Sequence, residues 1–191
     1  MEMAVAIGIG VGLASLAGVR AFLLPALSAL FAALGIFDLN DFGGAAGEWV
    51  LFGSLAGLSV LEIVLDKIRA IERVFNWIMV PIRAASGALL FGFASGAGVA
   101  ADAALWLVVG GVVAGAVAVG KVLLRPPGTA SSGVSTTFLS GIEDAIGLVG
   151  GVLASFVPYL PAVLVAFLLF FYARIRKRRG RKFGGLRILG D

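Results

Sequence analysis

The sequence predicts an all-α, polytopic membrane helix bundle, and three observations support this fold class. Of the 191 residues, 60% are apolar and only 14% are charged, whereas soluble domains have about 45–50% and 25%. Several apolar runs exceed the roughly 18 residues that indicate a transmembrane helix, and they do not alternate as barrel strands do. The 28 glycines allow helices to approach each other closely in lipid.

We expect about six transmembrane helices, because apolar runs of about 20 residues recur along the chain. The expected spans are Ala4–Leu24, Trp49–Leu65, Pro81–Ala100, Ala103–Leu124, Phe138–Val157 and Pro161–Tyr172. The first apolar run continues to Phe37 and contains Pro25. A broken first segment with a re-entrant or interfacial piece is therefore an alternative to one span, and the sequence leaves open whether residues 25–47 re-enter.

The charges predict a multi-pass protein of the cell membrane with both termini in the cytoplasm, because cytoplasmic loops collect Lys and Arg. One set of connections carries Lys67, Arg69, Arg73, Arg83, Lys121 and Arg125, and the other set carries Asp38, Asp41, Glu48 and Asp102. We expect a transmembrane domain of residues 1–173 and a basic tail of residues 174–191. The tail holds eight of the 15 basic residues, which favours anionic lipid as its partner. No aromatic residues alternate with these charges, so no nucleic-acid partner is expected.

An internal repeat is predicted between residues 3–100 and 103–173. Ser59 and Glu62 recur as Ser140 and Glu143, Pro81 recurs as Pro161, and Arg20 with Pro25 recurs as Lys121 with Pro126. If each half contains three spans, the halves have opposite orientations. A 3+3 inverted-topology repeat of this kind is typical of secondary transporters, whose sites lie near the midplane.

Ionisable side chains inside a bilayer are costly and are therefore candidates for a binding site. The candidates for binding a substrate or ion are Arg20, Ser59, Glu62, Asp66, Ser140, Glu143 and Asp144, followed by Lys67 and Lys121. Asp144, Gly147 and Gly151 continue a small, polar face from Ser140, which we expect to point into the bundle. Lys121 lies close to a helix end, so we expect it to snorkel to the membrane surface.

The excess of carboxylates predicts the charge of the ligand. Four carboxylates face only Arg20 and Lys121 in this set, which leaves two uncompensated and favours a cation or protons. Oxygen ligands suit Na⁺, Ca²⁺, Mg²⁺ or Mn²⁺ as the substrate, with Glu62 and Glu143 as the metal ligands. The chain has no Cys and no His, which excludes thiol and imidazole chemistry. We therefore expect no enzymatic activity and no resident cofactor.

Two other functions remain open. Arg20 and Lys121 could hold the head group of an anionic lipid or lipid-phosphate that the protein carries. Alternatively, small-residue motifs such as Gly111-x-x-x-Gly115 could serve a membrane scaffold or assembly protein that transports nothing. Small-residue faces are also compatible with a homodimer.

Three segments together resemble a family of small bacterial membrane proteins, the domain-of-unknown-function family four-one-two-six. They are Gly18-Val19-Arg20-Ala21-Phe22-Leu23-Leu24-Pro25, Glu62-Ile63-Val64-Leu65-Asp66-Lys67-Ile68 and Ser140-Gly141-Ile142-Glu143-Asp144. The resemblance extends to about Tyr172 and implies a membrane fold and the same carboxylates, but no activity. Where the family pattern has Asn-Pro, this chain has Thr136-Thr137. Glu62–Lys67 is also loosely similar to the Glu-x-Gly-Asp-Lys-Thr repeats of a cation-exchanger family.

Overall fold

The protein is described by a computed structural model that covers residues 3–36, 44–68, 71–96, 104–125, 136–154 and 156–184. Within these ranges it has seven helices and no strand. The helices are α1 (Met3–Val19), α2 (Leu23–Ala33), α3 (Gly44–Lys67), α4 (Glu72–Ala94), α5 (Ala104–Leu124), α6 (Thr136–Leu153) and α7 (Leu160–Gly184). Asp38, Asp41, Arg69, Asp102 and the side chains from residue 178 onward lie outside the described part.

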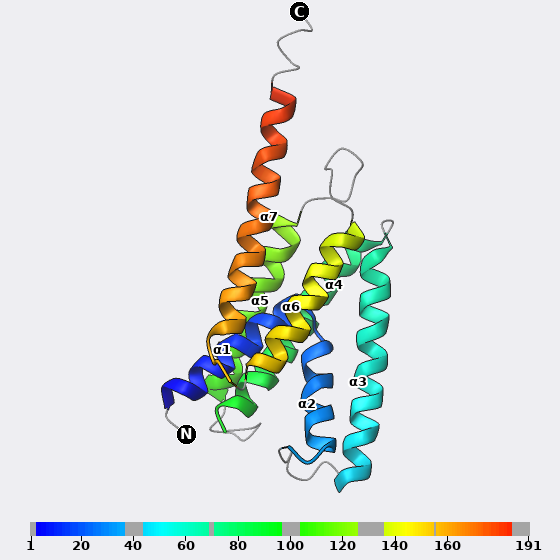
Figure 1. Ribbon diagram of the computed structural model, residues 1–191, viewed down its shortest axis with the longest axis vertical. Helices are drawn as coiled ribbons and strands as arrows, with labels where there is room; N and C mark the ends of the chain where they lie inside the picture. Colours follow the sequence, from blue (N-terminus) through cyan, green and yellow to red (C-terminus); the bar gives the residue numbers. More distant parts are fainter. Residues whose placement is uncertain are drawn as a thin grey trace, which may run out of the picture.

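Helices α3 to α7 run alternately up and down the bundle (Figure 1). Three of them, α3, α4 and α5, are long and apolar enough to cross a membrane, which agrees with a helical membrane bundle. Helices α4 and α5 have the most extensive contact among the described helices, and a Cβ atom added to Gly111 or Gly115 would lie 3.6–3.7 Å from Ala84. The Gly111-x-x-x-Gly115 motif, which was a candidate for assembly in a scaffold protein, therefore packs against α4 of the same chain.

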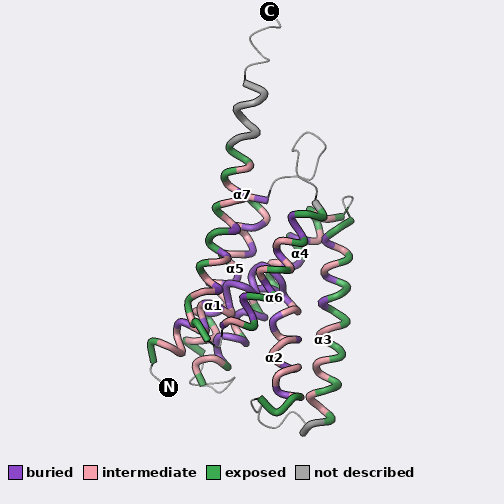
Figure 2. Tube along the Cα trace, viewed as in Figure 1, coloured by how far each residue is buried: buried purple, intermediate pink, exposed green. Residues whose placement is uncertain are grey.

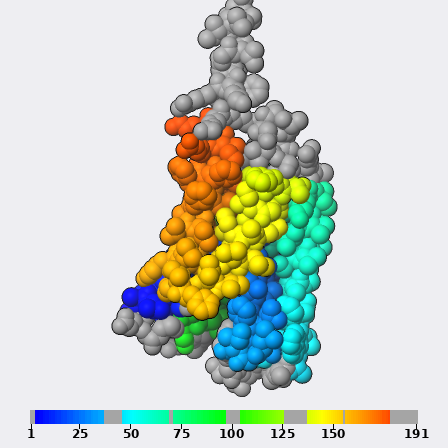
Figure 3. Space-filling model, viewed as in Figure 1, coloured from blue at the N-terminus to red at the C-terminus, as the bar shows by residue number. Residues whose placement is uncertain are grey.

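Helices α1 and α2 form a helical hairpin with its tip at residues 20–22. The hairpin enters the bundle and turns back toward the end from which it came (Figure 1). Gly12 lies against Pro161 at the start of α7, and Arg20 at the tip reaches Ser140 near the start of α6. Along α2, Leu23 lies against Gly147, and Leu24 lies against Gly151 farther along α6. The space-filling view shows α2 between α3 and α6 (Figure 3). The small face predicted on α6 thus points into the bundle, where it receives the hairpin.

Pro25 explains why the first apolar run breaks where it does. In a continuous helix, residue 25 would donate its N–H to the carbonyl of Ala21, but proline has no N–H and its ring clashes with that carbonyl. The Ala21 carbonyl instead accepts a hydrogen bond of 2.7 Å from the Ser86 hydroxyl. Pro25 itself lies in the first turn of α2, where a helix N–H has no helical partner anyway.

The helix ends correct several expected boundaries. Helix α4 begins at Glu72 and contains Pro81, so this proline does not open a span; membrane helices tolerate an internal proline when neighbouring groups satisfy the freed carbonyl. Pro161 does lie in the first turn of a helix, and α7 continues through residue 173 to Gly184. The start of α1 and the described end of α7 lie at opposite ends of the bundle (Figure 1), and the side of the membrane on which each terminus lies stays a prediction.

The 3+3 inverted repeat stays a prediction. Helices α4 and α7, which should correspond, run in opposite directions (Figure 1), as an inversion requires. Helix α1, however, runs parallel to its counterpart α5. Gly18 lies against Ala114, and the next residue, Val19, is bonded to Lys121 farther along α5. Helix α2, which has no counterpart in the second half, adds one reversal of chain direction and accounts for this difference.

The tip of the hairpin lies at the centre of the buried core. Leu16, Val19 and Leu24 flank the tip and pack with Leu139 and Leu168 of α6 and α7. Figure 2 shows the buried positions concentrated here, whereas α3 remains mostly exposed or half-buried along its length. Polar groups at the tip are consequently shielded from water and need partners within the protein.

Candidate functional site

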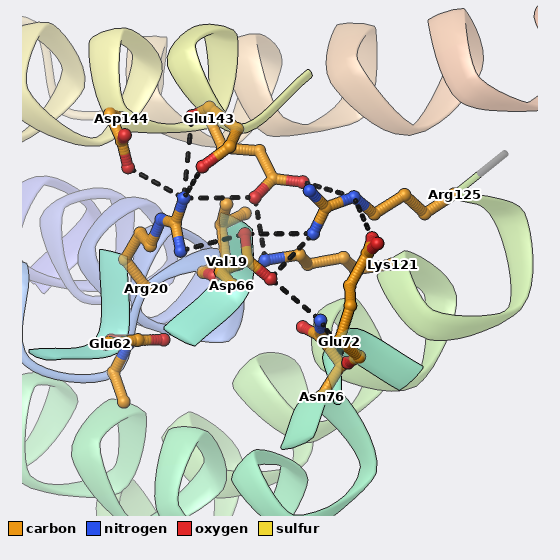
Figure 4. A network of polar contacts seen from close by, with 12 residues as sticks. Val19, Arg20, Glu62, Asp66, Glu72, Asn76, Lys121, Arg125, Glu143 and Asp144 are labelled. Carbon is orange, nitrogen blue, oxygen red and sulfur yellow. Dashed lines mark hydrogen bonds and ion pairs between the residues drawn. The ribbon is translucent and has the colours of Figure 1, made fainter. Parts of the chain in front are cut away.

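Nine charged side chains meet around the hairpin tip, and we call this set the charge network (Figure 4). Its members are Arg20, Glu62, Asp66, Glu72, Arg83, Lys121, Arg125, Glu143 and Asp144. They come from the tip and from α3, α4, α5 and α6, together with the residue after α5. One cluster therefore connects most of the helices of the bundle.

Arg20 occupies the centre of the charge network and has a fully buried side chain. Its guanidinium contacts Asp66 of α3 at 3.1 Å and Asp144 of α6 at 2.7 Å. It also donates a 2.8 Å hydrogen bond to the Ser140 hydroxyl. Arg20 thus neutralises carboxylates from α3 and α6.

Lys121 is buried, so the expectation that it snorkels to the surface is wrong. Its ammonium group lies 2.8 Å from Glu143 and donates to the carbonyl of Val19 at 3.1 Å. The reason is that the Val19 carbonyl, at the end of α1, needs a donor inside the bundle. Glu143 also accepts a 2.5 Å hydrogen bond from the Tyr172 hydroxyl and lies 3.6 Å from Arg125.

Asp66 links the hairpin tip to α4 and to the end of α5. Its carboxylate accepts hydrogen bonds of 2.8 and 2.9 Å from Arg125 and one of 2.8 Å from the amide of Asn76. Arg125 also contacts Glu72 at 3.3 Å. The side-chain carbonyl of Asn76 in turn accepts a 3.0 Å hydrogen bond from Arg83.

Glu62 holds the backbone of the hairpin tip. The N–H groups of Ala21 and Phe22 donate to its two carboxylate oxygens at 3.2 and 3.3 Å, and Arg83 donates to it at 3.0 Å. These N–H groups precede α2, whose own N-cap residue provides no side-chain cap. A helix N-terminus carries partial positive charge, so a carboxylate from α3 caps α2 from outside.

The charge balance of the network differs from the predicted excess of two carboxylates. Arg83 and Arg125, expected in surface loops, are buried members, and the network has five carboxylates and four basic side chains. Of the five carboxylates, Glu72 and Asp144 keep 15% and 25% of their side-chain surface exposed. These two carboxylates contact Arg20 and Arg125, so they belong to the balance. The predicted excess of two carboxylates therefore falls to one, which weakens the argument that favoured a cationic ligand.

The remaining predicted residues differ in position. Ser140 and Ser59 are buried, and Ser59 lies one helical turn before Glu62 on α3. Lys67, by contrast, is exposed at the end of α3 and has no ion pair among the described contacts. The structure thus brings the predicted carboxylates, Arg20 and Lys121 together and leaves Lys67 outside.

Sequence reasoning missed Arg83, Arg125, Glu72, Asn76 and Tyr172 as parts of the site. A helical signal was present for three of these residues. Asn76 and Arg83 are seven positions apart and therefore share a face of α4. Arg125 follows Lys121 by four positions, which continues the same face of α5. Assigning α4 to begin at Pro81 hid the first relation, because Asn76 then fell in a loop.

The structure gives no support for a metal site at Glu62 and Glu143. Within the described residues, no group of three or more acidic side chains is placed to hold a metal ion. Both carboxylates instead face basic side chains, Arg83 for Glu62 and Lys121 for Glu143. Positive groups thus occupy the positions that a metal ion would need.

An apolar pocket of about 320 Å³ lies beside the hairpin tip, between α2, α3 and α4. Its lining includes Ala21 and Phe22, whose N–H groups hold Glu62, and Ser86, whose hydroxyl holds the tip. At its edge, Ile82, Leu89 and Phe93 are 38–46% exposed. The pocket therefore opens on the outer, apolar side of the bundle and ends at the tip.

Comparison with known protein families gives a match over most of the chain. The family model described as "Domain of unknown function (DUF4126)" matches residues 7–178, which confirms the resemblance noted in the sequence. No curated protein and no solved structure matches the chain.

Proposed function

We propose a function from the geometry alone, since the chain belongs to the DUF4126 family, which is described only as a domain of unknown function. The proposal is a membrane carrier for a lipid-like molecule that enters the apolar pocket sideways from the bilayer. The observation that carries it is the position of the pocket, open toward the apolar exterior and closed by the hairpin tip.

The arrangement of the helices supports a membrane carrier. We propose that α3 to α7 cross the bilayer and that α1 and α2 re-enter from one side, which replaces the six-span arrangement. Broken helices at membrane depth are tolerated only where protein or a cavity surrounds them, and many transporters place their binding sites at such breaks. Lys121, Ser86 and Glu62 satisfy backbone groups of Val19, Ala21 and Phe22, as such a position requires.

The size and lining of the pocket support an apolar ligand. A cavity of about 150 Å³ lined by aliphatic and aromatic residues binds benzene, and ligand sites usually measure about 300–1,000 Å³. At about 320 Å³, this pocket suits part of an alkyl chain. Because exposed apolar side chains surround its opening, a ligand can enter it without crossing water.

The test is transbilayer movement of a fluorescent fatty acid in proteoliposomes. Ala85 lines the pocket, so Ala85→Trp fills it, whereas Leu105→Trp places the same ring on an exposed position of α5. We expect the wild type and Leu105→Trp to accelerate movement over protein-free vesicles and Ala85→Trp to lose the acceleration. Equal movement with Ala85→Trp, or no acceleration by the wild type, would refute the proposal.

Proton movement is a second candidate. It is supported by a series of polar contacts that runs from Tyr172 through Glu143, Arg20, Asp66 and Asn76 to Arg83. The two partly exposed members, Asp144 and Glu72, are within reach of water at its edges. A pH-sensitive dye inside proteoliposomes would report this flux, with Na⁺, Ca²⁺, Mg²⁺ and Mn²⁺ gradients applied in turn. Flux lost in Glu143→Gln would favour this function, and an unchanged internal pH in every gradient would exclude it.

We also propose that the basic end of α7 binds anionic lipid. Arg174, Arg176 and Lys177 are exposed, and each basic residue near an anionic surface contributes about 1 kcal/mol. Cosedimentation with vesicles that contain increasing phosphatidylserine tests this, using a peptide of residues 174–191 and a scrambled control. Equal binding to neutral vesicles would contradict it.

A further inference from the structure

Glu62 sits in a site built for an anion. Its carboxylate receives two backbone N–H groups at the start of α2 and two donors of Arg83, Nη2 at 3.0 Å and Nε at 3.4 Å. Backbone N–H groups at a helix N-terminus bind phosphates and carboxylates in many proteins, and a guanidinium matches the same groups. Because the Glu62 carboxylate occupies these donors, a ligand that replaces it should also carry an anionic oxygen group.

We propose that the anionic head group of the carried molecule, a carboxylate or a phosphate on an alkyl chain, binds here in exchange with Glu62. This inference rests on the proposed function and specifies its substrate class. Ala21 and Phe22 contribute both to the wall of the pocket and to the anion site. An alkyl chain in the pocket therefore brings its head group to the hairpin tip.

The donors remain in place when Glu62 leaves. Arg83 is held independently by the Asn76 carbonyl at 3.0 Å, and the Asn76 amide donates to Asp66 at 2.8 Å. The Ala21 carbonyl stays bonded to Ser86, which fixes the backbone of the tip. The exchange consequently requires movement of one side chain on α3, rather than dismantling of the network.

The exchange leaves the charge of the site unchanged. One anionic group replaces another beside Arg83, so the guanidinium is paired in both states, and an unpaired buried charge would be costly in a medium of low dielectric constant. Arg20 Nε and Arg125 Nη2 are also buried without a hydrogen-bond partner among the described residues, so the network retains donor capacity.

This site differs from the one expected for an anionic lipid. Arg20 and Lys121 were the expected head-group ligands, but carboxylates from two helices surround Arg20, and Lys121 is committed to Glu143 and the Val19 carbonyl. Arg83, which sequence reasoning assigned to a loop, lies one turn from the pocket residue Ser86 on α4. We therefore assign the head-group role to Arg83.

The test compares two photoreactive probes on the purified wild-type protein: hexadecanoic acid and hexadecanol, each with a diazirine at the same chain carbon. We expect both to label peptides of α2, α3 or α4, and the acid to label about tenfold more strongly, because only the acid gains hydrogen bonds to a charged group. Phosphatidic acid should compete with the acid probe, whereas inorganic phosphate should not.

Each outcome decides a different claim. Equal labelling by acid and alcohol would overturn the anion site and leave the lipid carrier standing. Absence of labelling in the pocket by both probes would overturn the carrier as well. Competition by inorganic phosphate would overturn an alkyl-linked ligand in favour of a free anion. All of these comparisons use the wild-type protein, so none of them depends on the folding of a variant.

Two matched pairs of variants then locate the site. Glu62→Gln removes the competing charge and should increase labelling by the acid probe, whereas Arg83→Gln should decrease it about tenfold, since a charged donor is lost. Glu48→Gln on α3 and Arg73→Gln on the exposed face of α4 change the same charges away from the network and should leave labelling unchanged. A decrease in Glu62→Gln equal to that in Arg83→Gln would contradict the exchange.

Discussion

Replacing Lys121 by Met removes one charge from the centre of the charge network and keeps most of the side-chain volume. In the wild type, the Lys121 ammonium lies 2.8 Å from Glu143 and 3.1 Å from the Val19 carbonyl. The substitution leaves that carbonyl without its side-chain donor and leaves Glu143 with less positive charge around it. We expect the free energy of unfolding to fall substantially.

The magnitude follows from the groups that remain. Removing one partner of a buried ion pair costs about 3–5 kcal/mol, because the other charge stays buried. Glu143 keeps Arg20 at 3.4 Å, Arg125 at 3.6 Å and the Tyr172 hydroxyl, which places the cost at the lower end. We therefore expect a loss of about 3 kcal/mol.

Reversible unfolding in mixed micelles, followed by circular dichroism, measures this loss. Lys67→Met is the control, because Lys67 is exposed at the end of α3, and surface changes usually stay within about 0.5 kcal/mol. Glu143→Gln in the Lys121→Met background should cost less than it does alone. If Lys121→Met were as stable as Lys67→Met, Lys121 would snorkel as its position near the helix end suggests, and the buried network would be wrong.

Two further predictions concern packing and hydrogen bonding. Tyr172→Phe removes a donor to Glu143 and should lower the free energy of unfolding by about 1.5–3 kcal/mol, whereas Tyr159→Phe, whose hydroxyl donates at an exposed position, should cost less; equal losses would contradict the buried contact. Gly18→Ala places a Cβ atom 2.5 Å from the Ala114 carbonyl and should destabilise by about 1–3 kcal/mol. Gly53→Ala meets no atom within 4 Å and should be neutral or stabilising in the same assay, and equal destabilisation would contradict the packing of α1 on α5.

Much of the fold could be predicted because the bilayer makes apolar runs informative. The expected span Ala103–Leu124 agrees closely with α5 (Ala104–Leu124), where no polar residue interrupts the run before Lys121. The expected span Pro81–Ala100 began too late, because proline commonly lies at the start of a helix. The polar residues Asn76 and Arg83 were consequently assigned to a loop. Their tertiary partners, Asp66 and Glu62 on α3, are what make them compatible with a buried helix.

Four of the five carboxylates of the site could be predicted, whereas Arg83 and Arg125 could not. Glu62, Asp66 and Glu143 lie within apolar runs, where a charge is conspicuous. Arg83 and Arg125 lie near expected helix ends, where a basic residue is ordinary, so only the three-dimensional arrangement identifies them as buried. This omission overstated the excess of negative charge and thereby led to the preference for a cation.

The hairpin of α1 and α2 is the feature on which both the pocket and the charge network depend, and cysteine labelling tests directly whether it re-enters the membrane. The chain has no Cys, so Met3→Cys, Ile36→Cys and Lys67→Cys each introduce a single reactive thiol at an exposed position. With a membrane-impermeant maleimide applied to vesicles of known orientation, we predict that positions 3 and 36 label from the same side and position 67 from the opposite side. Labelling of position 36 from the side of position 67 would show that the first segment crosses the membrane, and it would contradict the hairpin.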